Sequence, residues 1–480
     1  MNSISLQLQR VRPGFGVGRT KFIVSALLLL STGYEIDAIS SVMNHRNISS
    51  SPLLYKVMDY SEKQLSMEFE PWVSGMFDPD HTMANLSPNG TSTIRLDQLG
   101  FGDVNPEWIL LGGKNSQANY QSTLHFKPEL LMYGLLFHAY KQFQYWYFDV
   151  KTALLECQTN IELEEAGGND GMISINNNQV LYNAYDAFTQ IDWQYGKMGR
   201  SQRLIGFDDI QITLGSTADM HSFSSDATQT YFSGFGIIQV PTGRGTTAEW
   251  LFEPQVGTNH WGVGFGADVL IKSENGFQLT AGGNFRHFIA GWETRSFDLT
   301  YNGAWSRYIG IDTIVIHTPG VSTPGINLFT QQALIDGRNQ ITMYARLEKR
   351  FQACLFELSY NYQHAQAEHI SQVTRIDQGF GIFDMYASLG GQAVTASHAT
   401  ISQGSAQVVE DPNSPVQLVT SDLNLVSGAA QAVNSSMITA RLQRAQEGYT
   451  YGVGVSADVA HSAQAISSWS VWANFEILLP

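Results

Sequence analysis

The sequence is poor in charged residues and has almost no long apolar runs. Only 15% of the 480 residues are charged, well below the quarter that is usual for a soluble protein. After residue 38, no run approaches the roughly 20 apolar residues that a membrane helix needs. The mean hydropathy is nonetheless slightly negative, at -0.13. These absences argue against an ordinary soluble surface and against a helical membrane protein.

Cysteine and basic residues are also scarce. Cys157 and Cys354 are the two cysteines, and they lie far apart in sequence. Because a disulfide needs Cα atoms within about 7 Å, we expect both thiols to be unpaired. Lys and Arg number 27 against 43 Asp and Glu, which gives a net charge of -16. We expect no nucleic-acid partner, since phosphate contacts need a basic face.

The N-terminal residues have the pattern of a secretory signal peptide. Four basic residues precede the apolar run from Phe22 to Leu30, and Ala38 offers a small residue for cleavage. The run is too short to span a bilayer comfortably, which favours a cleaved signal over a permanent anchor. We therefore expect a signal peptide at residues 1–38, an N-terminal extension at 39–65 and one exported domain at 66–480.

The chain is rich in segments that alternate apolar and polar residues. From Trp469 to Leu479 every second residue is apolar and the residues between them are mostly polar, with Trp472 as the exception. Successive side chains of a strand point to opposite faces, so the pattern predicts a strand with one apolar face. The same alternation recurs at residues 261–269, 277–286, 341–348, 356–363, 438–443 and 449–459. Asn275-Gly276 lies between two of these runs and predicts a hairpin turn.

Alternation alone also fits a soluble β-sandwich, but three features favour a membrane barrel. The expected strands have about 10–14 residues, which is long for a soluble sheet and right for a tilted membrane strand. Glycines crowd the polar face. Aromatic residues gather near strand ends, as in interfacial girdles, at Tyr145 to Tyr147, Tyr360 and Tyr362, and Tyr449 and Tyr451. We predict an all-β fold, an antiparallel transmembrane β-barrel of about 12–14 strands.

The pattern gives more candidate strands than the barrel needs, and some early ones are weak. The candidates lie near residues 66–76, 104–112, 121–127, 129–140, 145–157, 202–215, 228–240, 256–272, 276–288, 294–309, 339–350, 352–364, 380–388, 435–445, 447–460 and 467–479. Very short connections follow residues 272, 350 and 445, whereas long polar ones occupy 159–200, 311–338 and 389–434. This asymmetry predicts short periplasmic turns and long external loops.

Charged residues of both signs occur in the middle of the polar faces. In a soluble sandwich they would face bulk water, but in a membrane barrel they face the interior. We expect the following residues to line a pore: Asp268, Arg286, Arg346, Glu348, Arg441, Asp458 and Glu476. Pore width and these charges would then set selectivity.

Patterns for catalysis or metal binding are weak. His364 and His369 are five residues apart beside Glu368, a spacing that misses the i, i+4 pattern of zinc proteases. Asp208-Asp209 would point to opposite faces of a strand and so could not act as a carboxylate pair. We expect no catalytic residues, no metal, no cofactor and no enzymatic activity. A membrane-embedded hydrolase stays open, because its triad is defined by geometry and not by order.

Short glycine motifs frame the first half of the predicted barrel. Gly100-Phe-Gly-Asp103 and Gly206-Phe-Asp-Asp209 each lead into an alternating run, and Val240-Pro-Thr-Gly243 ends another. These motifs resemble the outer-membrane channel group that includes the aromatic-degradation porins and the long-chain fatty-acid transporters. There, a Gly-x-Gly-Asp strand entry and a Val/Leu-Pro-Thr-Gly strand exit recur. The match covers about 150 residues in short pieces.

The resemblance implies a monomeric channel in the outer membrane of a Gram-negative-type bacterium, with membrane lipid and small-molecule solutes as partners. Passage would be passive, and the solutes include hydrophobic ones. The last strand is similar to the signal that the barrel-assembly machinery reads, although the chain ends Leu479-Pro480 and not in an aromatic residue. The alternative is a structural or adhesive outer-membrane barrel that acts through its external loops.

Overall fold

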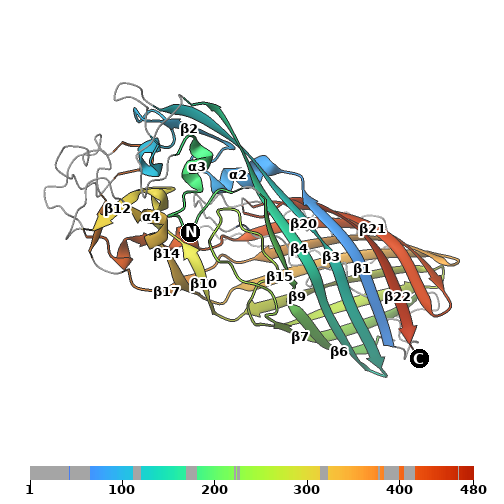
Figure 1. Cartoon of the computed structure of the whole chain (residues 1–480). Helices are drawn as coiled ribbons and strands as arrows, with labels where there is room; N and C mark the ends of the chain where they lie inside the picture. Colours follow the sequence, from blue (N-terminus) through green and yellow to red (C-terminus); the bar gives the residue numbers. More distant parts are fainter. Residues whose placement is uncertain are drawn as a thin grey trace, which may run out of the picture. The chain divides into compact units, whose positions relative to one another are not determined.

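Twelve antiparallel strands close into a barrel in the computed structural model of this chain (Figure 1). The structure describes residues 43, 65–111, 120–168, 181–199, 201–220, 223, 228–313, 323–376, 379–382, 399–404, 417–462 and 464–479. The proposed signal peptide at 1–38 and nearly all of the extension at 39–65 lie outside these residues. In the described part, no helix is both long enough and apolar enough to cross a membrane.

The barrel strands follow one another around the wall almost in chain order. Their bounds are β1 Leu65–Met76, β3 Gln121–Phe143, β4 Trp146–Gly167, β6 Ile210–Asp219, β7 Thr228–Val240, β8 Gly262–Ser273, β9 Phe277–Phe288, β15 Asn339–Phe351, β16 Cys354–Ala365, β20 Val433–Gln446, β21 Tyr449–Ala460 and β22 Ser468–Leu479. The first strand pairs with the last, with Leu65 opposite Leu479, and this pairing closes the barrel. The observed number confirms the prediction of about 12–14 strands.

The outer surface of the wall is apolar. Alternate side chains on β8, β9, β15, β16, β20, β21 and β22 are large, apolar and 42–65% exposed: Val263, Phe265, Leu279, Leu347, Leu358, Ile438, Val453, Val455 and Phe475. A soluble monomer rarely exposes a continuous apolar area of this kind. In a membrane barrel the same side chains face lipid, and the closed wall leaves no strand edge unpaired in the hydrocarbon.

Exposed aromatic residues ring the end of the barrel where the strands turn. Tyr145, Trp146, Phe277, Phe351 and Tyr449 are all at least 36% exposed there. The expected girdle is therefore present at this rim, with one correction. Tyr147 is 3% exposed and points inward, where its hydroxyl lies 3.1 Å from Ser233 Oγ, because it alternates with the outward side chains of Trp146 and Phe148.

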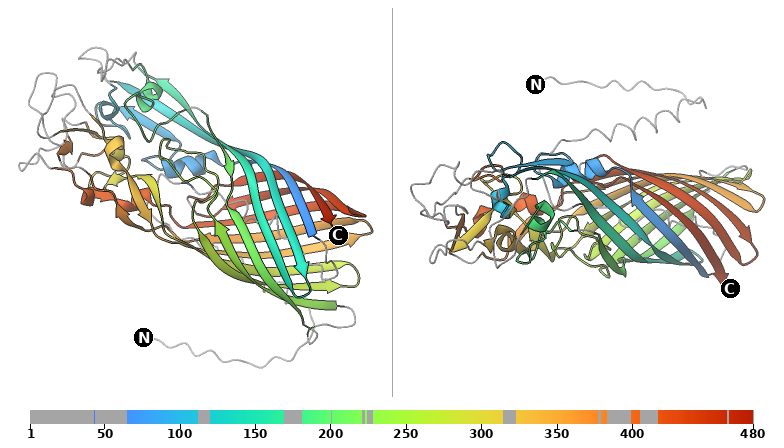
Figure 2. Two further views of the ribbon diagram at one scale, coloured as in Figure 1. Left: turned by 60° about the horizontal axis from the view of Figure 1, so that its bottom comes forward. Right: turned by 45° about the horizontal axis from the view of Figure 1, so that its top comes forward.

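Short and long connections lie at opposite rims, as predicted. At one rim, which we call the turn side, two-residue turns join β3 to β4, β15 to β16 and β20 to β21, and three residues join β8 to β9. Gly276 and Gly448 have φ of +80° there, which favours glycine. Eight residues join β6 to β7 at this rim as well, and every connection longer than that leaves the other rim, the loop side (Figures 1 and 2).

Several predicted strands differ from the structure. The segment 104–112 contains the short helix η3 Pro106–Ile109, because Asn105 caps its first N–H and Pro106 suits its first turn. Segments 121–127 and 129–140 form the single strand β3. Pro128 is tolerated there because it lies between two pairings of one edge of β3. The pairing with β1 ends at Leu131, and the pairing with β2 Thr93–Asp97 starts at His125.

Three other segments and the start of one loop also differ from the prediction. The segment 202–215 is split into β5 Gln202–Phe207 and β6 at Asp208-Asp209. The segment 294–309 joins no barrel strand, because it forms β10 Gly291–Ser296, β11 Asp298–Leu299 and η5 Ser306–Tyr308 above the rim. Of 380–388, only β18 Phe380–Ile382 is described, in a small sheet outside the barrel. The loop expected from residue 159 starts later, since β4 continues to Gly167.

The loop side carries a packed cap. It contains α2 Pro79–Leu86, β2 Thr93–Asp97, α3 Ala184–Phe188, β12 Gly310–Thr313, β13 Thr323–Pro324, α4 Gly325–Phe329, β14 Thr330–Ile335, β17 Ile370–Val373, η8 Thr420–Asp422, β19 Leu423–Asn424 and α5 Leu425–Gly428. An aromatic cluster of Phe188, Trp193, Trp305 and Tyr308 forms its centre. Trp305 Nε1 donates to Leu86 O at 2.7 Å, which ties this cluster to α2.

Candidate functional site

The structure places all seven predicted pore-lining residues on the inward face of the wall. Asp268 is half-buried, and the other six are at most 8% exposed. Several inward positions are glycine because the side chains around them leave no room for a Cβ. A Cβ at Gly454 would lie 2.2 Å from Trp472, and one at Gly266 would lie 2.4 Å from Phe235. Trp472, the exception to the terminal alternation, is therefore an inward side chain packed over a glycine.

Arg441 forms ion pairs across the lumen. Its Nη2 lies 2.6 Å from Glu357 Oε2 on the neighbouring strand β16. Its Nη1 lies 3.7 Å from Glu68 and 3.9 Å from Glu70, both on β1. Strands β21 and β22 separate β20 from β1 in the wall, so these contacts reach through the interior of the barrel.

Two further groups extend these contacts around the wall. On β15, Arg346 lies 3.4 Å from Glu348 and 3.6 Å from Glu357. On the opposite side, His138 lies 3.5 Å from Glu68 and 2.7 Å from Asp149, and Lys151 lies 3.2 Å from Asp149. Together they form one connected set, which we call the lumen network: Glu68, Glu70, His138, Asp149, Lys151, Arg346, Glu348, Glu357 and Arg441.

The lumen network includes Arg346, Glu348 and Arg441 from the seven predicted residues, and six others. A signal for some of the others was present. Ser66, Glu68 and Glu70 alternate with Met67 and Phe69, and Asp149 and Lys151 are two residues apart. Their pairing had no such signal, because it depends on which strands face each other across the barrel.

A cavity of about 270 Å³ opens below the lumen network, at the turn side. Glu68, Glu348, Arg441 and Glu476 line its inner part, and Lys272 and Arg350 line the part nearer the turns. Ser66 Oγ donates to Glu476 Oε1 at 2.5 Å. Three of the residues predicted to line a pore, Glu348, Arg441 and Glu476, thus lie around one cavity.

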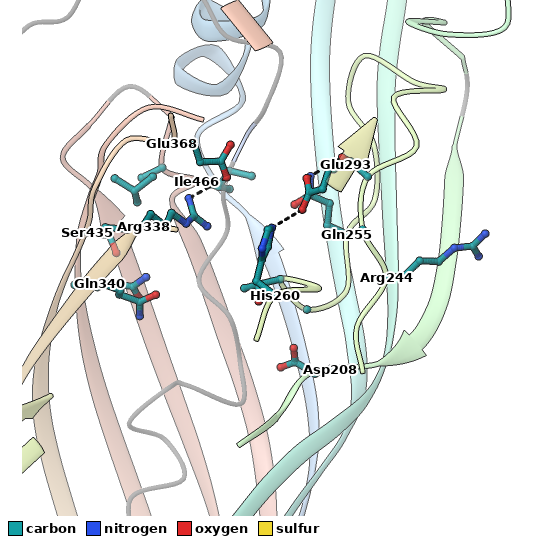
Figure 3. Close-up of a pocket in the computed structure, with 18 of the residues that line it drawn as sticks. Asp208, Arg244, Gln255, His260, Glu293, Arg338, Gln340, Glu368, Ser435 and Ile466 are labelled. Carbon is teal, nitrogen blue, oxygen red and sulfur yellow. Dashed lines mark hydrogen bonds and ion pairs between the residues drawn. The ribbon is translucent and has the colours of Figure 1, made fainter. Parts of the chain in front are cut away.

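A second cavity of about 60 Å³, the mouth pocket, lies at the loop side (Figure 3). Asp458, Gln340 and Ser435 come from the barrel wall, while His260, Glu293 and Arg338 come from the segments above it. Asp268 and Arg286 line neither cavity. Asp268 accepts from the Tyr344 hydroxyl at 3.2 Å, and Arg286 Nη1 lies 3.5 Å from Gln239 Oε1.

One carboxylate of the mouth pocket, Glu293, is paired with two cations. Glu293 lies 2.8 Å from His260 Nε2 and 2.6 Å from Arg295 Nη2. Burial disfavours the charged carboxylate, but Arg295 and His260 outweigh it and lower the pKa of Glu293 to about 2. Burial also opposes the charged form of His260, yet Glu293 raises its pKa above the usual value. Both residues lie outside the membrane-spanning strands.

Asp208 and Asp209 lie at the break between β5 and β6, and not within a strand as expected. Asp209 accepts from Gly243 N at 3.0 Å, Thr258 N at 2.6 Å, Thr258 Oγ1 at 2.7 Å and Gln239 Nε2 at 2.8 Å. We call these contacts the rim knot. They join the Gly-Phe-Asp-Asp motif to the Pro-Thr-Gly motif, two patterns that the sequence presents separately.

The histidines considered for metal binding do not converge. His364 Nδ1 lies 2.7 Å from Asn434 Oδ1, and His369 Nδ1 lies 2.8 Å from Asp336 Oδ2. Glu368 instead accepts from Ala430 N at 2.9 Å and pairs with Arg295 and Arg338. Within the described ranges, no group of three His, Cys, Asp or Glu residues could hold a metal ion. Cys157 and Cys354 are free thiols, as predicted.

A closed antiparallel barrel, apolar outside, charged inside, with short turns at one rim and long loops at the other, defines the class of outer-membrane β-barrels. No protein-family model and no curated protein matches the sequence. Among solved structures, an outer-membrane channel from Pseudomonas putida F1 has a TM-score of 0.37 at 7% identity, over 87% of this chain and 96% of that one.

Other solved barrels are also similar. The toluene transporter TbuX of Ralstonia pickettii has a TM-score of 0.25 at 7% identity, over 87% of this chain and 90% of that one. The transport unit of the autotransporter AIDA-I from Escherichia coli has a TM-score of 0.29 at 8% identity, over 89% and 94%.

Proposed function

We propose that this protein is an outer-membrane channel through which small solutes diffuse passively. The observation that carries the proposal is the lumen network, with a cavity on the turn side and another at the loop side. The network contains five acids and three permanent cations, so a permeating ion would meet acidic and basic side chains in turn. Such a lining favours polar solutes over hydrophobic ones, and it supports transport rather than catalysis.

Single-channel recording on the purified, refolded chain in planar bilayers tests the proposal. We expect small, stable open steps, because side chains of the lumen network occupy the middle of the barrel. A bilayer that stays silent, with the barrel shown to be folded, would overturn the channel and favour the structural or adhesive alternative. Lipid turnover by the same preparation would overturn it in favour of a membrane hydrolase.

Ion selectivity tests whether the current passes the lumen residues. Arg441→Gln should move the reversal potential in a salt gradient towards cation preference, and Glu348→Gln should move it towards anion preference. Arg444→Gln is the matched control, because Arg444 lies on the same strand with an exposed side chain. Reversal potentials that are equal in all three variants would show that ions do not pass the lumen network.

Biogenesis and assembly belong to the same proposal. We propose residues 1–38 as a cleaved signal peptide, 39–65 as an extension and the remainder as the barrel. Strand β22 would be the segment read by the barrel-assembly machinery, and its pairing with β1 supports a role in closing the wall. We propose a monomer as the functional form, and the pairing of β1 with β22 means that the wall needs no strand from another chain.

A further inference from the structure

The mouth pocket contains several buried N–H donors that no described residue satisfies. Arg295 is 4% exposed, and its Nη2 pairs with Glu293 and Glu368, but its Nε and Nη1 have no hydrogen-bond partner among the described residues. Arg338 Nη1 lies 3.5 Å from Glu368 without forming a hydrogen bond. Gln340 Nε2 is also buried without an acceptor. All three residues line the same cavity.

The two glutamates beside these donors, in contrast, already have partners of their own. Glu293 Oε1 contacts His260, and Oε2 accepts from Arg295 and from Thr246 Oγ1 at 3.3 Å. Glu368 accepts from the Ala430 amide and faces both arginines. A group that enters the pocket therefore meets spare donors, and a buried donor without an acceptor is unfavourable.

The cavity suits a small acceptor group. A water needs about 10–15 Å³ in this measure, so about 60 Å³ holds a few heavy atoms. A carboxylate is compact and presents two oxygens with about four lone-pair sites. Its hydrogen bonds to arginine are also stronger than those of a neutral amide or hydroxyl.

We propose that the mouth pocket binds the carboxylate group of a small anionic solute, with Arg295, Arg338 and Gln340 as the donors. This inference rests on the proposed channel function, for which it supplies the solute class and an entry subsite. Figure 3 shows the arrangement: Arg338 faces Glu368 on one side, His260 faces Glu293 on the other, and Arg244 points away.

Acetate binding to the refolded full-length chain in detergent, followed by saturation-transfer NMR, tests this subsite. Acetamide is the matched neutral probe. We expect acetate to bind and acetamide to bind much more weakly. Arg338→Gln should weaken acetate roughly tenfold or more, because a hydrogen bond to a charged group is lost. Gln340→Leu should weaken it a few-fold. Arg444→Gln should leave it unchanged, because Arg444 is an exposed residue of β20 outside the pocket.

The carboxylate subsite and the channel can each be contradicted without the other. Equal binding of acetate and acetamide, or full acetate affinity in Arg338→Gln, would overturn the carboxylate subsite. If that occurs while the wild type conducts, the channel proposal stands alone. Acetate binding that depends on Arg338 in a barrel that never conducts would support the subsite and overturn the channel.

Discussion

Individual glycines decide how large side chains fit inside this barrel. Gly454 lies beside Trp472 on the neighbouring strand, and Gly215 lies beside Tyr147, whose ring a Cβ would approach to 2.1 Å. These glycines lie on the polar face of their strands in the sequence, where they give no hint of an aromatic neighbour. The neighbour comes from the register between strands.

Gly454→Ala should lower the free energy of unfolding by about 1–3 kcal/mol, because the new methyl group overpacks against the Trp472 ring. In a Trp472→Leu background, where the ring is absent, the same Gly454→Ala change should cost much less than it does in the wild type. Urea unfolding in lipid vesicles, followed by circular dichroism, gives the comparison. Gly234→Ala is the control, since its Cβ would meet no atom closer than 3.9 Å. A single variant as stable as the wild type would contradict this packing.

At the scale of elements, the rim knot explains why two strands and a long connection meet where they do. Asp209 directly precedes β6, while Gly243 and Thr258 lie in the connection between β7 and β8. The Pro-Thr-Gly sequence ends β7 and turns the chain so that the Gly243 amide points at the carboxylate. The knot thereby fixes the wall of the mouth pocket, which Gly257 and Thr258 line.

Asp209→Ala should destabilise the protein by at least about 2 kcal/mol, because the buried Gln239 amide and the half-buried amides of Gly243 and Thr258 lose their acceptor. It should also make the connection at 241–261 more sensitive to protease. Limited proteolysis and urea unfolding report the two effects. The control is Glu164→Gln, which removes only an exposed pair with Lys127 and should cost less than about 1 kcal/mol. Protease resistance unchanged from wild type would show that the knot does not hold this connection.

At the scale of the whole molecule, the barrel has an apolar exterior and a charged interior. This is the reverse of a soluble fold, and it is stable because lipid replaces water on the outside. The cap on the loop side follows the ordinary rule instead, with Phe188, Trp305 and Ile309 fully buried. One chain thus contains two packing regimes that meet at the rim.

Val455→Arg should destabilise the barrel in lipid vesicles by about 2–4 kcal/mol if this face meets the bilayer midplane. Val455 is 52% exposed on the outer face of β21. Ile191→Arg places the same side chain on an exposed loop position, 78% exposed, and should have little effect. Urea unfolding of both variants measures the difference. Equal stability of the two variants would argue against lipid contact at Val455.

The sequence by itself determined the strands and their two faces. Alternation is a local property of the backbone, so β7, β9, β15, β16 and β20 to β22 could be predicted within a few residues. The pattern failed where tertiary contacts override local preference. Residues 104–111 and 294–309 belong to segments predicted as strands but lie in the cap, where they pack against neighbouring segments instead of joining the wall.

Only the tertiary structure decided which charges meet. Arg441 pairs with Glu68 and Glu70 because β20 and β1 face each other across the lumen, about 370 residues apart in sequence. The mouth pocket likewise joins Arg295 of β10 to Arg338 and Gln340 at the start of β15. Strand faces follow from residues two apart, whereas the network and the pocket follow from barrel closure, which no local pattern encodes.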